Sequence, residues 1–304
     1  MWKAESTFVN EPKWLPKTKI GDHSLVKQKP RQKTETETKT ETTLKKIPPS
    51  IYIGGAACGV AFFVGVAHAM RAHWGEDFHT KTQICGDSVG AIVALQLALG
   101  LSSRDIELVA KSIQRKMRLE PHWFEGQNYW LNQYIDYIIQ LKPDIHKLME
   151  QRKYQVGTTN MDLLYKWHSS WDSPEALARC VKGSLNVPIY CDHCELVDGE
   201  EVMDGALGFD GSKFPHGNDT LFIGANQTYA EINYNLNLFQ LVVPDNQAGF
   251  SELFHAGVNA FNQWNGETQD KTGRVMNIYG VYFCWIGKHI QLLYDFIVRE
   301  IIEK

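Results

Sequence analysis

The sequence has few of the features that mark secreted or membrane-spanning proteins. Its 304 residues include 6 cysteines, too few in a chain of this length for a dense disulfide framework. No apolar run reaches the roughly 18–20 residues that span a bilayer, and the nearest candidate, residues 275–287, is followed by Lys288 and His289. The first residues, MWKAESTFVN, lack the charged stub and apolar core of a secretory signal. We therefore expect an intracellular, cytoplasmic protein whose contact with a membrane or lipid droplet is peripheral.

An excess of basic residues is also missing. Lysine and arginine number 31 against 35 acidic residues, which gives a formal net charge of −4. This balance argues against nucleic acid as a partner. Hydrophobic residues make up 43% and charged residues 22%, so the chain can bury the core of an ordinary globular protein.

The composition divides the chain into three parts. Residues 1–49 contain the stretch KQKPRQKTETETKTETTLKK, which has no apolar period and cannot offset the entropy cost of ordering. We predict a disordered polar tail over 1–49, a globular domain over 50–265, and a C-terminal extension over 266–304. The extension ends in an amphipathic helix, because apolar residues recur at helical spacing between 290 and 301.

The globular part repeats a strand, a glycine turn and a helix. Residues 51–53 predict a buried strand, the segment GGAACG a turn, and the apolar run from Val60 to Met70 a buried helix. The segment TQICGDSVGAIVALQLALG repeats this order and ends at Gly100, a plausible C-terminal stop. Alternating strands and helices predict an α/β fold with a central, mostly parallel sheet covered by helices on both faces.

Further elements follow the same alternation. Residues 102–117 predict an amphipathic helix capped by Ser102 or Ser103, and residues 153–161 predict a strand. Another helix should start at Ser173 and Pro174, since proline suits the first helical position.

The segment GDSVG has the pattern of a nucleophile elbow. In this pattern a serine lies on a sharp strand-to-helix turn, and its neighbours must be small because the backbone is strained there. Gly86 and Gly90 supply that room around Ser88, with Asp87 and Val89 between them. The start of the following helix also directs free N–H groups at developing negative charge. A simple helix-entry turn is the alternative interpretation of these five residues.

The segment GGAACG can present consecutive backbone N–H groups to an anion, either a phosphate or the oxyanion of a tetrahedral intermediate. It lacks the Gly-Lys-Ser/Thr ending of a P-loop, and no clear acidic residue follows at the distance that dinucleotide binding requires. An oxyanion hole is the favoured interpretation. Its candidate residues are Gly54, Gly55, Ala56, Ala57, Cys58 and Gly59.

A serine nucleophile needs a base, and two kinds are available. The α/β-hydrolase order of serine, acid and histidine would use a histidine. The candidate histidines are His193, His216 and His255. The alternative is a carboxylate acting directly on the serine: Asp204 follows a short apolar pair and precedes the turn residues Gly205 and Ala206.

The segment CDHC at 191–194 has the Cys-x-x-Cys spacing of a zinc site, but no second pair of matching spacing follows. We therefore expect no metal and no cofactor.

The order GGAACG, GDSVG and DGA resembles the patatin-like phospholipases. The segments GVAFFVGVAHAMRAH, VPIYCD and NLFQLVVPDNQAGFSELFHAGVNAF resemble the adipose triglyceride lipase and adiponutrin branch of that family. The resemblance implies a three-layer α/β/α fold, Ser88 as nucleophile, Asp204 as general base and the GGAACG loop as oxyanion hole. It implies hydrolysis of acyl esters in phospholipids or acylglycerols at a membrane or lipid-droplet surface, without a metal. The resemblance does not identify a protein activator.

Two positions depart from the family pattern. Ala56 stands where the family usually has glycine, and alanine resists positive φ. Asp87 stands where small or apolar residues are typical. It could raise the pKa of a neighbouring acid or repel an oxyanion, but we favour a role in capping the following helix. These departures motivate an alternative, a catalytically weak lipid-binding or scaffold protein.

Overall fold

The computed structural model describes residues 45–119, 123–187, 194–209, 214, 216–227 and 229–268. The tail up to residue 44 and the C-terminal helix expected near 290–301 lie outside these ranges, so both stay predictions.

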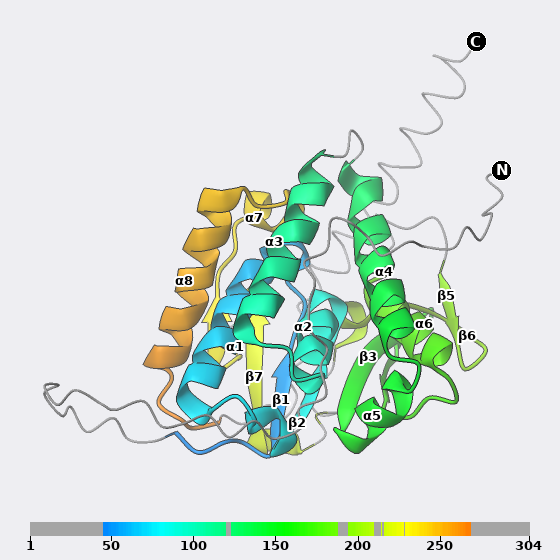
Figure 1. Ribbon diagram of the computed structural model, residues 1–304, viewed down its shortest axis with the longest axis horizontal. Helices are drawn as coiled ribbons and strands as arrows, with labels where there is room; N and C mark the ends of the chain where they lie inside the picture. Colours follow the sequence, from blue (N-terminus) through cyan, green and yellow to red (C-terminus); the bar gives the residue numbers. More distant parts are fainter. Residues whose placement is uncertain are drawn as a thin grey trace, which may run out of the picture.

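The described strands form one eight-stranded sheet (Figure 1). The strands are β1 (Ser50–Ile53), β2 (Gln83–Gly86), β3 (Tyr154–Asn160), β4 (Tyr165–His168), β5 (Glu195–Val197), β6 (Glu200–Asp204), β7 (Thr220–Ala225) and β8 (Ile232–Tyr234). Their order is β5-β6-β3-β2-β1-β7-β8, with β4 also paired to β3. Strands β3, β2, β1, β7 and β8 are neighbours in this order and pair in parallel. Strands β4 and β6 pair antiparallel with β3, and β5 pairs antiparallel with β6. The predicted α/β fold with a mostly parallel central sheet is confirmed.

Helices flank the sheet, and in Figure 1 helices α1 and α8 lie side by side to the left of β7 and β1. The helices are α1 (Val60–Trp74), α2 (Ser88–Ala98), α3 (Ser103–Leu119), α4 (Trp123–Leu141), α5 (Ile145–Gln151), α6 (Pro174–Ser184), α7 (Leu238–Val242) and α8 (Gln247–Gln263). Short 3-10 turns cover Ala57–Gly59, Phe78–Thr80, Gly205–Gly208 and Gly217–Asp219. Helix α1 packs along α8, and α2 packs on β2.

Most predicted element ends agree with the structure, and one differs in a useful way. Gly100 has φ of 76° and ends the segment of α2 as expected. Of the two candidate caps of α3, Ser102 is the one whose side chain accepts from the backbone of Asp105, at 3.2 Å. The helix predicted to follow the GDSVG turn begins within it, at Ser88 itself, because the Asp87 carbonyl already accepts the first helical bond from the Ala91 N–H, at 3.1 Å.

The two faces of the sheet bury different side chains, because successive residues of a strand point to opposite faces. Ile51 and Ile53 belong to the large core beneath the helices, which also contains residues of α1, α2, α3, α6 and α8. Tyr52, between them, belongs to a second core. The members of this second core, called here the aromatic core, are Tyr52, Cys85, Tyr165, Phe209, Phe214, Phe222 and Ala230.

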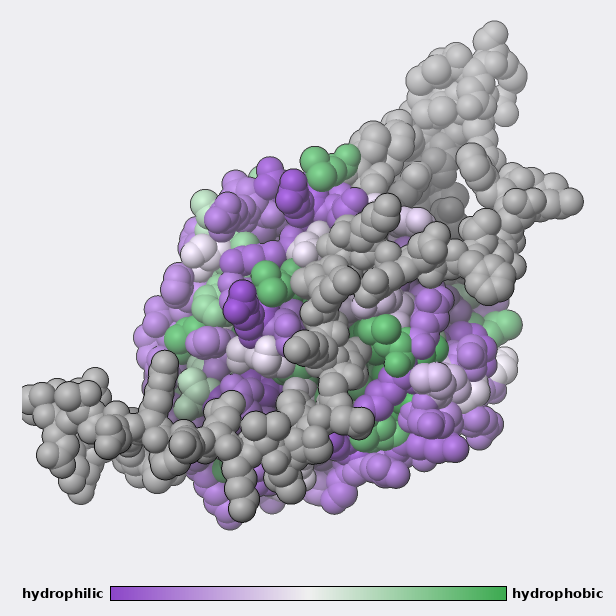
Figure 2. All heavy atoms as spheres, in the orientation of Figure 1, coloured by the Kyte–Doolittle hydropathy of each residue, from purple (hydrophilic) through white to green (hydrophobic). Residues whose placement is uncertain are grey.

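The outer surface is mixed. Figure 2 shows hydrophilic residues over much of the visible face, with apolar residues in small groups between them. Within the described ranges, no helix has the length and apolar character needed to cross a bilayer.

Candidate active site

The strand register brings Ser88 and Asp204 to the same level of the sheet. Gly86 at the end of β2 pairs with Val156 of β3, and two residues further along β3, Thr158 pairs with Asp204 of β6. Ser88 likewise follows Gly86 by two residues. Two residues separated by more than a hundred positions in sequence therefore face the same end of the sheet.

Ser88 lies on a strained turn between β2 and α2. Its φ is 50°, a left-handed value that is unusual for a residue other than glycine, and its side chain is buried. A Cβ at Gly90 would lie 2.2 Å from the Ile53 carbonyl oxygen, and one at Gly86 would lie 2.7 Å from the Gly90 backbone. Both flanking glycines are thus required by close backbone approach. Strain of this kind is typical of a nucleophile elbow.

Ser184 anchors the elbow from α6. The Ser88 N–H donates to the Ser184 hydroxyl at 2.9 Å, and that hydroxyl donates to the Gly157 carbonyl of β3 at 2.6 Å. The bonds tie the elbow, α6 and β3 together and occupy the Ser88 N–H. Sequence reasoning missed Ser184, since a serine near the end of an amphipathic helix carries no local signal.

Asp204 is buried at the end of β6, with 2% of its surface exposed. Its N–H donates to the Asn186 carbonyl at 2.9 Å, and its Oδ1 accepts from the Ala206 N–H at 2.9 Å. Burial raises the pKa of Asp204 to about 6, while hydrogen bonding from the Ser88 side chain and the Ala206 backbone lowers it. The other carboxyl oxygen of Asp204, Oδ2, has no hydrogen bond of standard geometry within the described residues.

The three sequence motifs meet at Gly55. A Cβ placed on Gly55 would lie 3.0 Å from the Ala206 Cβ and 3.1 Å from the Ser88 Cβ, with the Ser88 hydroxyl oxygen at 3.5 Å. Gly55 belongs to the GGAACG loop, Ser88 to the elbow, and Ala206 to the acid turn. The structure therefore brings the predicted oxyanion loop, nucleophile and acid turn into direct contact.

Two of the predicted oxyanion donors are engaged elsewhere. The Gly54 N–H donates to the Ile223 carbonyl of β7 at 2.9 Å, and the Gly59 N–H donates to the Ala56 carbonyl at 2.8 Å. Neither N–H is available to a substrate. The prediction that the whole loop from 54 to 59 supplies donors is too broad, because the ends of the loop complete the sheet and a 3-10 turn.

The strain expected at Ala56 lies one residue further on. Ala56 has φ of −147°, which alanine adopts freely, whereas Ala57 has φ of 45°. The loop is held from outside by Gln114 of α3, whose Nε2 donates to the Cys58 carbonyl at 2.7 Å.

Asp87 does not cap α2, so the favoured interpretation of this residue is wrong. Its side chain makes no capping hydrogen bond. Instead it is fully buried beside the aromatic core, where its Oδ2 accepts from the hydroxyls of Tyr52 and Tyr165. Burial, and then the charge of Asp204, raise the pKa of Asp87 well above its ordinary value, although donors including the Gly55 N–H lower it.

The histidine candidates lie apart from this site where the structure describes them. His216 contacts the Gln83 side chain at 2.9 Å, at the opposite end of β2 from the elbow. His255 is exposed on α8, with its ring against Phe254. His193 lies outside the described residues.

The CDHC segment is only partly covered, since Cys191 lies outside the described residues. Among the residues that are described, no group of three or more His, Cys, Asp or Glu side chains could hold a metal ion.

An apolar pocket of about 30 Å³ adjoins the elbow and the loop. Ala57 of the loop and Val89, which follows Ser88, both line it. Its other apolar residues include Ile92, Val93, Ile113, Met117 and Leu131. The lining suits a hydrocarbon group, but the volume is small.

The chain matches no protein-family model and no curated protein. Among solved structures it is similar to VipD from Legionella pneumophila, with 12% sequence identity, a TM-score of 0.48, and 85% of this chain and 77% of VipD covered. It is also similar to the type III effector protein ExoU, with 11% identity, a TM-score of 0.37 and 71% of this chain covered. The match spans 52% of the ExoU chain, about half its length. Likenesses this distant carry no argument about activity, which rests on the site itself.

Proposed function

We propose that the protein is a serine acylhydrolase that cleaves lipid esters through a Ser88–Asp204 dyad. The observation that carries the proposal is the convergence at Gly55, where a serine with φ of 50° meets the oxyanion loop and the turn that follows a buried aspartate. The sequence resemblance to the patatin-like phospholipases, in its adipose triglyceride lipase and adiponutrin branch, supports the same chemistry.

In the proposed reaction, Asp204 takes the Ser88 proton as the hydroxyl oxygen attacks the ester carbonyl. The N–H groups of Ala56 and Ala57 face the resulting oxyanion, and the Val89 N–H at the start of α2 assists, since the first N–H groups of a helix have no partner within it. The protonated acid then gives its proton to the leaving alcohol. Water, deprotonated by the same carboxylate, attacks the acyl-enzyme; the bond from the acyl carbon to the Ser88 oxygen breaks, Asp204 returns the proton to that oxygen, and the fatty acid leaves.

The raised pKa of Asp204 supports its role as base. A carboxylate with an ordinary pKa near 3.8 is a weak base for an alcohol, and burial brings this pKa to about 6, closer to the operating pH at which a general base is most effective. Activity should therefore require the ionised form and fall as the pH drops through about 6.

One observation favours the alternative, a catalytically weak lipid-binding protein. The Gly55 N–H lies close enough to the Asp87 carboxyl to lower its pKa, and the Gly54 N–H is engaged by β7. The loop thus has fewer free donors than its six residues suggest. Losing one donor costs about a hundredfold or more in rate at comparable sites.

Turnover of phosphatidylcholine vesicles and triolein emulsions by purified variants tests the proposal. We expect Ser88→Ala and Asp204→Asn each to lose at least about a hundredfold in kcat/KM, while His193→Ala, His216→Ala and His255→Ala keep the parent rate. Dependence on one histidine with Asp204→Asn active would favour a triad instead. A parent that turns over neither ester but binds both lipids would favour the lipid-binding alternative.

A fluorophosphonate probe gives an independent readout, because it labels only an activated serine. We expect labelling of the parent at Ser88 and none of Ser88→Ala, with Ser112→Ala as a matched control, since Ser112 lies on α3 and donates to the Leu108 carbonyl of its own helix. A parent that stays unlabelled would contradict an activated nucleophile even if a contaminating esterase gave turnover.

A further inference from the structure

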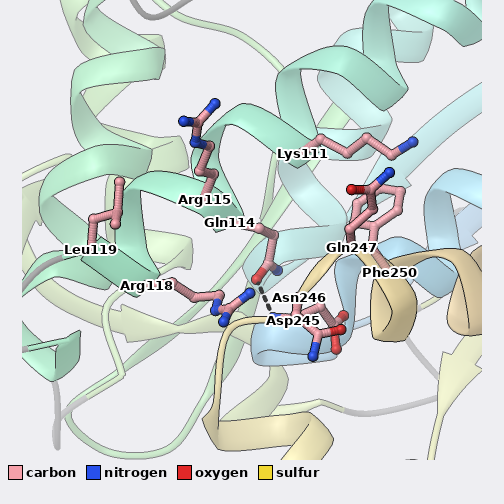
Figure 3. A pocket seen from close by; sticks show the side chains of 9 residues that line it. All are labelled: Lys111, Gln114, Arg115, Arg118, Leu119, Asp245, Asn246, Gln247 and Phe250. Atoms are coloured by element: carbon pink, nitrogen blue, oxygen red, sulfur yellow. Dashed lines mark hydrogen bonds between the residues drawn. The ribbon is translucent and has the colours of Figure 1, made fainter.

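A larger pocket lies outside the proposed active site, between α3 and the start of α8 (Figure 3). Its volume is about 420 Å³, and it opens to the surface. Gln114 lines it from α3, while Asn246 and Gln247 line it from the first residues of α8. Phe250 and Leu119 also line it, so the pocket combines apolar surface with charged and polar side chains.

Cationic side chains dominate the α3 wall. Lys111, Arg115 and Arg118 are four and three residues apart, a spacing that places them on one face of a helix. Arg115 and Arg118 form no ion pair with any described residue, whereas Lys111 is paired with Glu107 at 2.6 Å. Positive charge is therefore concentrated at this pocket in a chain whose formal net charge is −4.

The opposite wall is also suited to an anion. Helix α8 has 17 residues, and its cap, Asn246, satisfies only the Gly249 N–H, at 2.8 Å. The N–H groups that remain at the first turn carry the positive end of the helix dipole. One carboxyl, Asp245, also lines the pocket; burial and Glu252 raise its pKa to about 6, while Arg118 lowers it, so it is mostly ionised near neutral pH and offsets one of the three positive charges.

We propose that the pocket between α3 and α8 binds the phosphate group of an organic phosphate. The Arg118 side chain, which points toward Asp245 in Figure 3, offers a planar pair of donors that matches phosphate oxygens, and Arg115 and Lys111 add positive charge to the same wall. The volume exceeds what a bare phosphate needs and leaves room for the attached organic group against Phe250. A lipid headgroup and a small soluble phosphate ester share this chemistry, and the experiment below separates them.

The pocket is joined to the candidate active site through one side chain. Gln114 accepts from the Asp245 N–H at 2.8 Å on the pocket side, and it donates to the Cys58 carbonyl of the oxyanion loop on the other. A ligand that orders the start of α8 would therefore also fix the loop. The binding proposal does not depend on the hydrolase activity, because it concerns separate residues.

Binding is measured with the full-length Ser88→Ala protein, so that lipids are not consumed. Titration calorimetry uses inorganic phosphate, glycerol 3-phosphate and acetate at equal ionic strength. Co-sedimentation uses vesicles of phosphatidylcholine alone and with phosphatidic acid. Each is repeated with Arg115→Gln/Arg118→Gln and with the matched control Arg104→Gln/Arg179→Gln, which removes two exposed arginines outside the pocket.

We expect the Arg115→Gln/Arg118→Gln change to weaken phosphate binding by at least about tenfold, as the loss of a charge-assisted hydrogen bond predicts. The control should stay within about twofold of the parent. If the Arg115→Gln/Arg118→Gln variant loses binding to the soluble phosphates, the ligand is a small phosphate ester. If it loses binding only to vesicles that contain phosphatidic acid, the ligand is a lipid headgroup. Either result supports the site. No binding to either, acetate binding as tight as phosphate, or equal losses in the two double variants would overturn it.

Discussion

The two faces of the central sheet differ in what they can bury. The face beneath the helices is lined by aliphatic side chains such as Ile51, Ile84 and Leu221. The other face carries the aromatic core, where the Tyr52 ring stacks on Phe209 at 5.3 Å between centroids and meets Phe222 at 4.7 Å. Both faces exclude water, but the aromatic core also presents phenolic hydroxyls.

The difference decides where a carboxyl can be buried. Aliphatic side chains offer no hydrogen-bond donor, and a buried polar group without a partner is costly. A tyrosine supplies an apolar ring and a polar tip together. Asp87 lies where two such tips, from Tyr52 and Tyr165, converge on one of its oxygens. The aromatic core therefore carries the second acid of the site, and the helix-covered face supplies the apolar pocket.

The largest effect that tests this contrast is expected from Asp87→Leu. Leucine keeps the volume but leaves the hydroxyls of Tyr52 and Tyr165 without their acceptor, and each buried orphan group costs about 1–3 kcal/mol. We expect a loss of about 2–5 kcal/mol in the free energy of unfolding, measured by urea denaturation. The control on the other face, Ile92→Val, should cost only about 1 kcal/mol. Equal losses would show that Asp87 is not held by the tyrosines.

A smaller effect is expected from Asp204→Asn, and it depends on pH. Because the folded-state pKa of about 6 lies above the ordinary value of 3.8, the folded state binds this proton more tightly than the unfolded chain. The stability that the carboxyl contributes is complete below about pH 4 and is lost as the pH rises through 6. Asparagine does not titrate. The free energy of unfolding of the Asp204→Asn variant, relative to that of the parent, should therefore grow by up to about 3 kcal/mol between pH 4 and pH 7.5.

Urea denaturation at these two pH values checks the prediction. Asp77→Asn serves as a control, since Asp77 is exposed and paired with Lys81. A relative stability of Asp204→Asn that does not change with pH would mean that burial does not raise the pKa of Asp204.

The sequence predicted the elements that rest on local pattern. Apolar runs and glycines located β1, β2 and their helices, because period and backbone freedom act within a few residues. Ser88 and the glycines around it could be found for the same reason. The choice of Asp204 over a histidine as the base came from the family resemblance, since register between distant strands leaves no local trace.

The aromatic core could not be predicted in this way. Phe209, Phe214 and Phe222 come from a turn, a loop and a strand, with no common period. The role of Asp87 was misjudged because an aspartate before a helix usually caps it. Here the Asp87 carboxyl accepts instead from hydroxyls that lie 35 and 78 positions away in sequence, which only the folded sheet brings together.

The smallest expected effect tests whether Asp87 is neutral or charged when Asp204 ionises. Asp87 should remain neutral while Asp204 ionises, because burial and the charge of Asp204 both raise the pKa of Asp87. Asp87→Asn then replaces one neutral acceptor by another, and the acidic limb of the kcat/KM profile should stay within about 0.3 pH units of its position near 6 in the parent. If Asp87 were instead ionised, its removal would lower the pKa of Asp204 by about one unit or more, and the limb would move towards pH 5. The position of the limb, read independently of any change in maximal rate, therefore decides whether the aromatic core holds a neutral acid or a second charge.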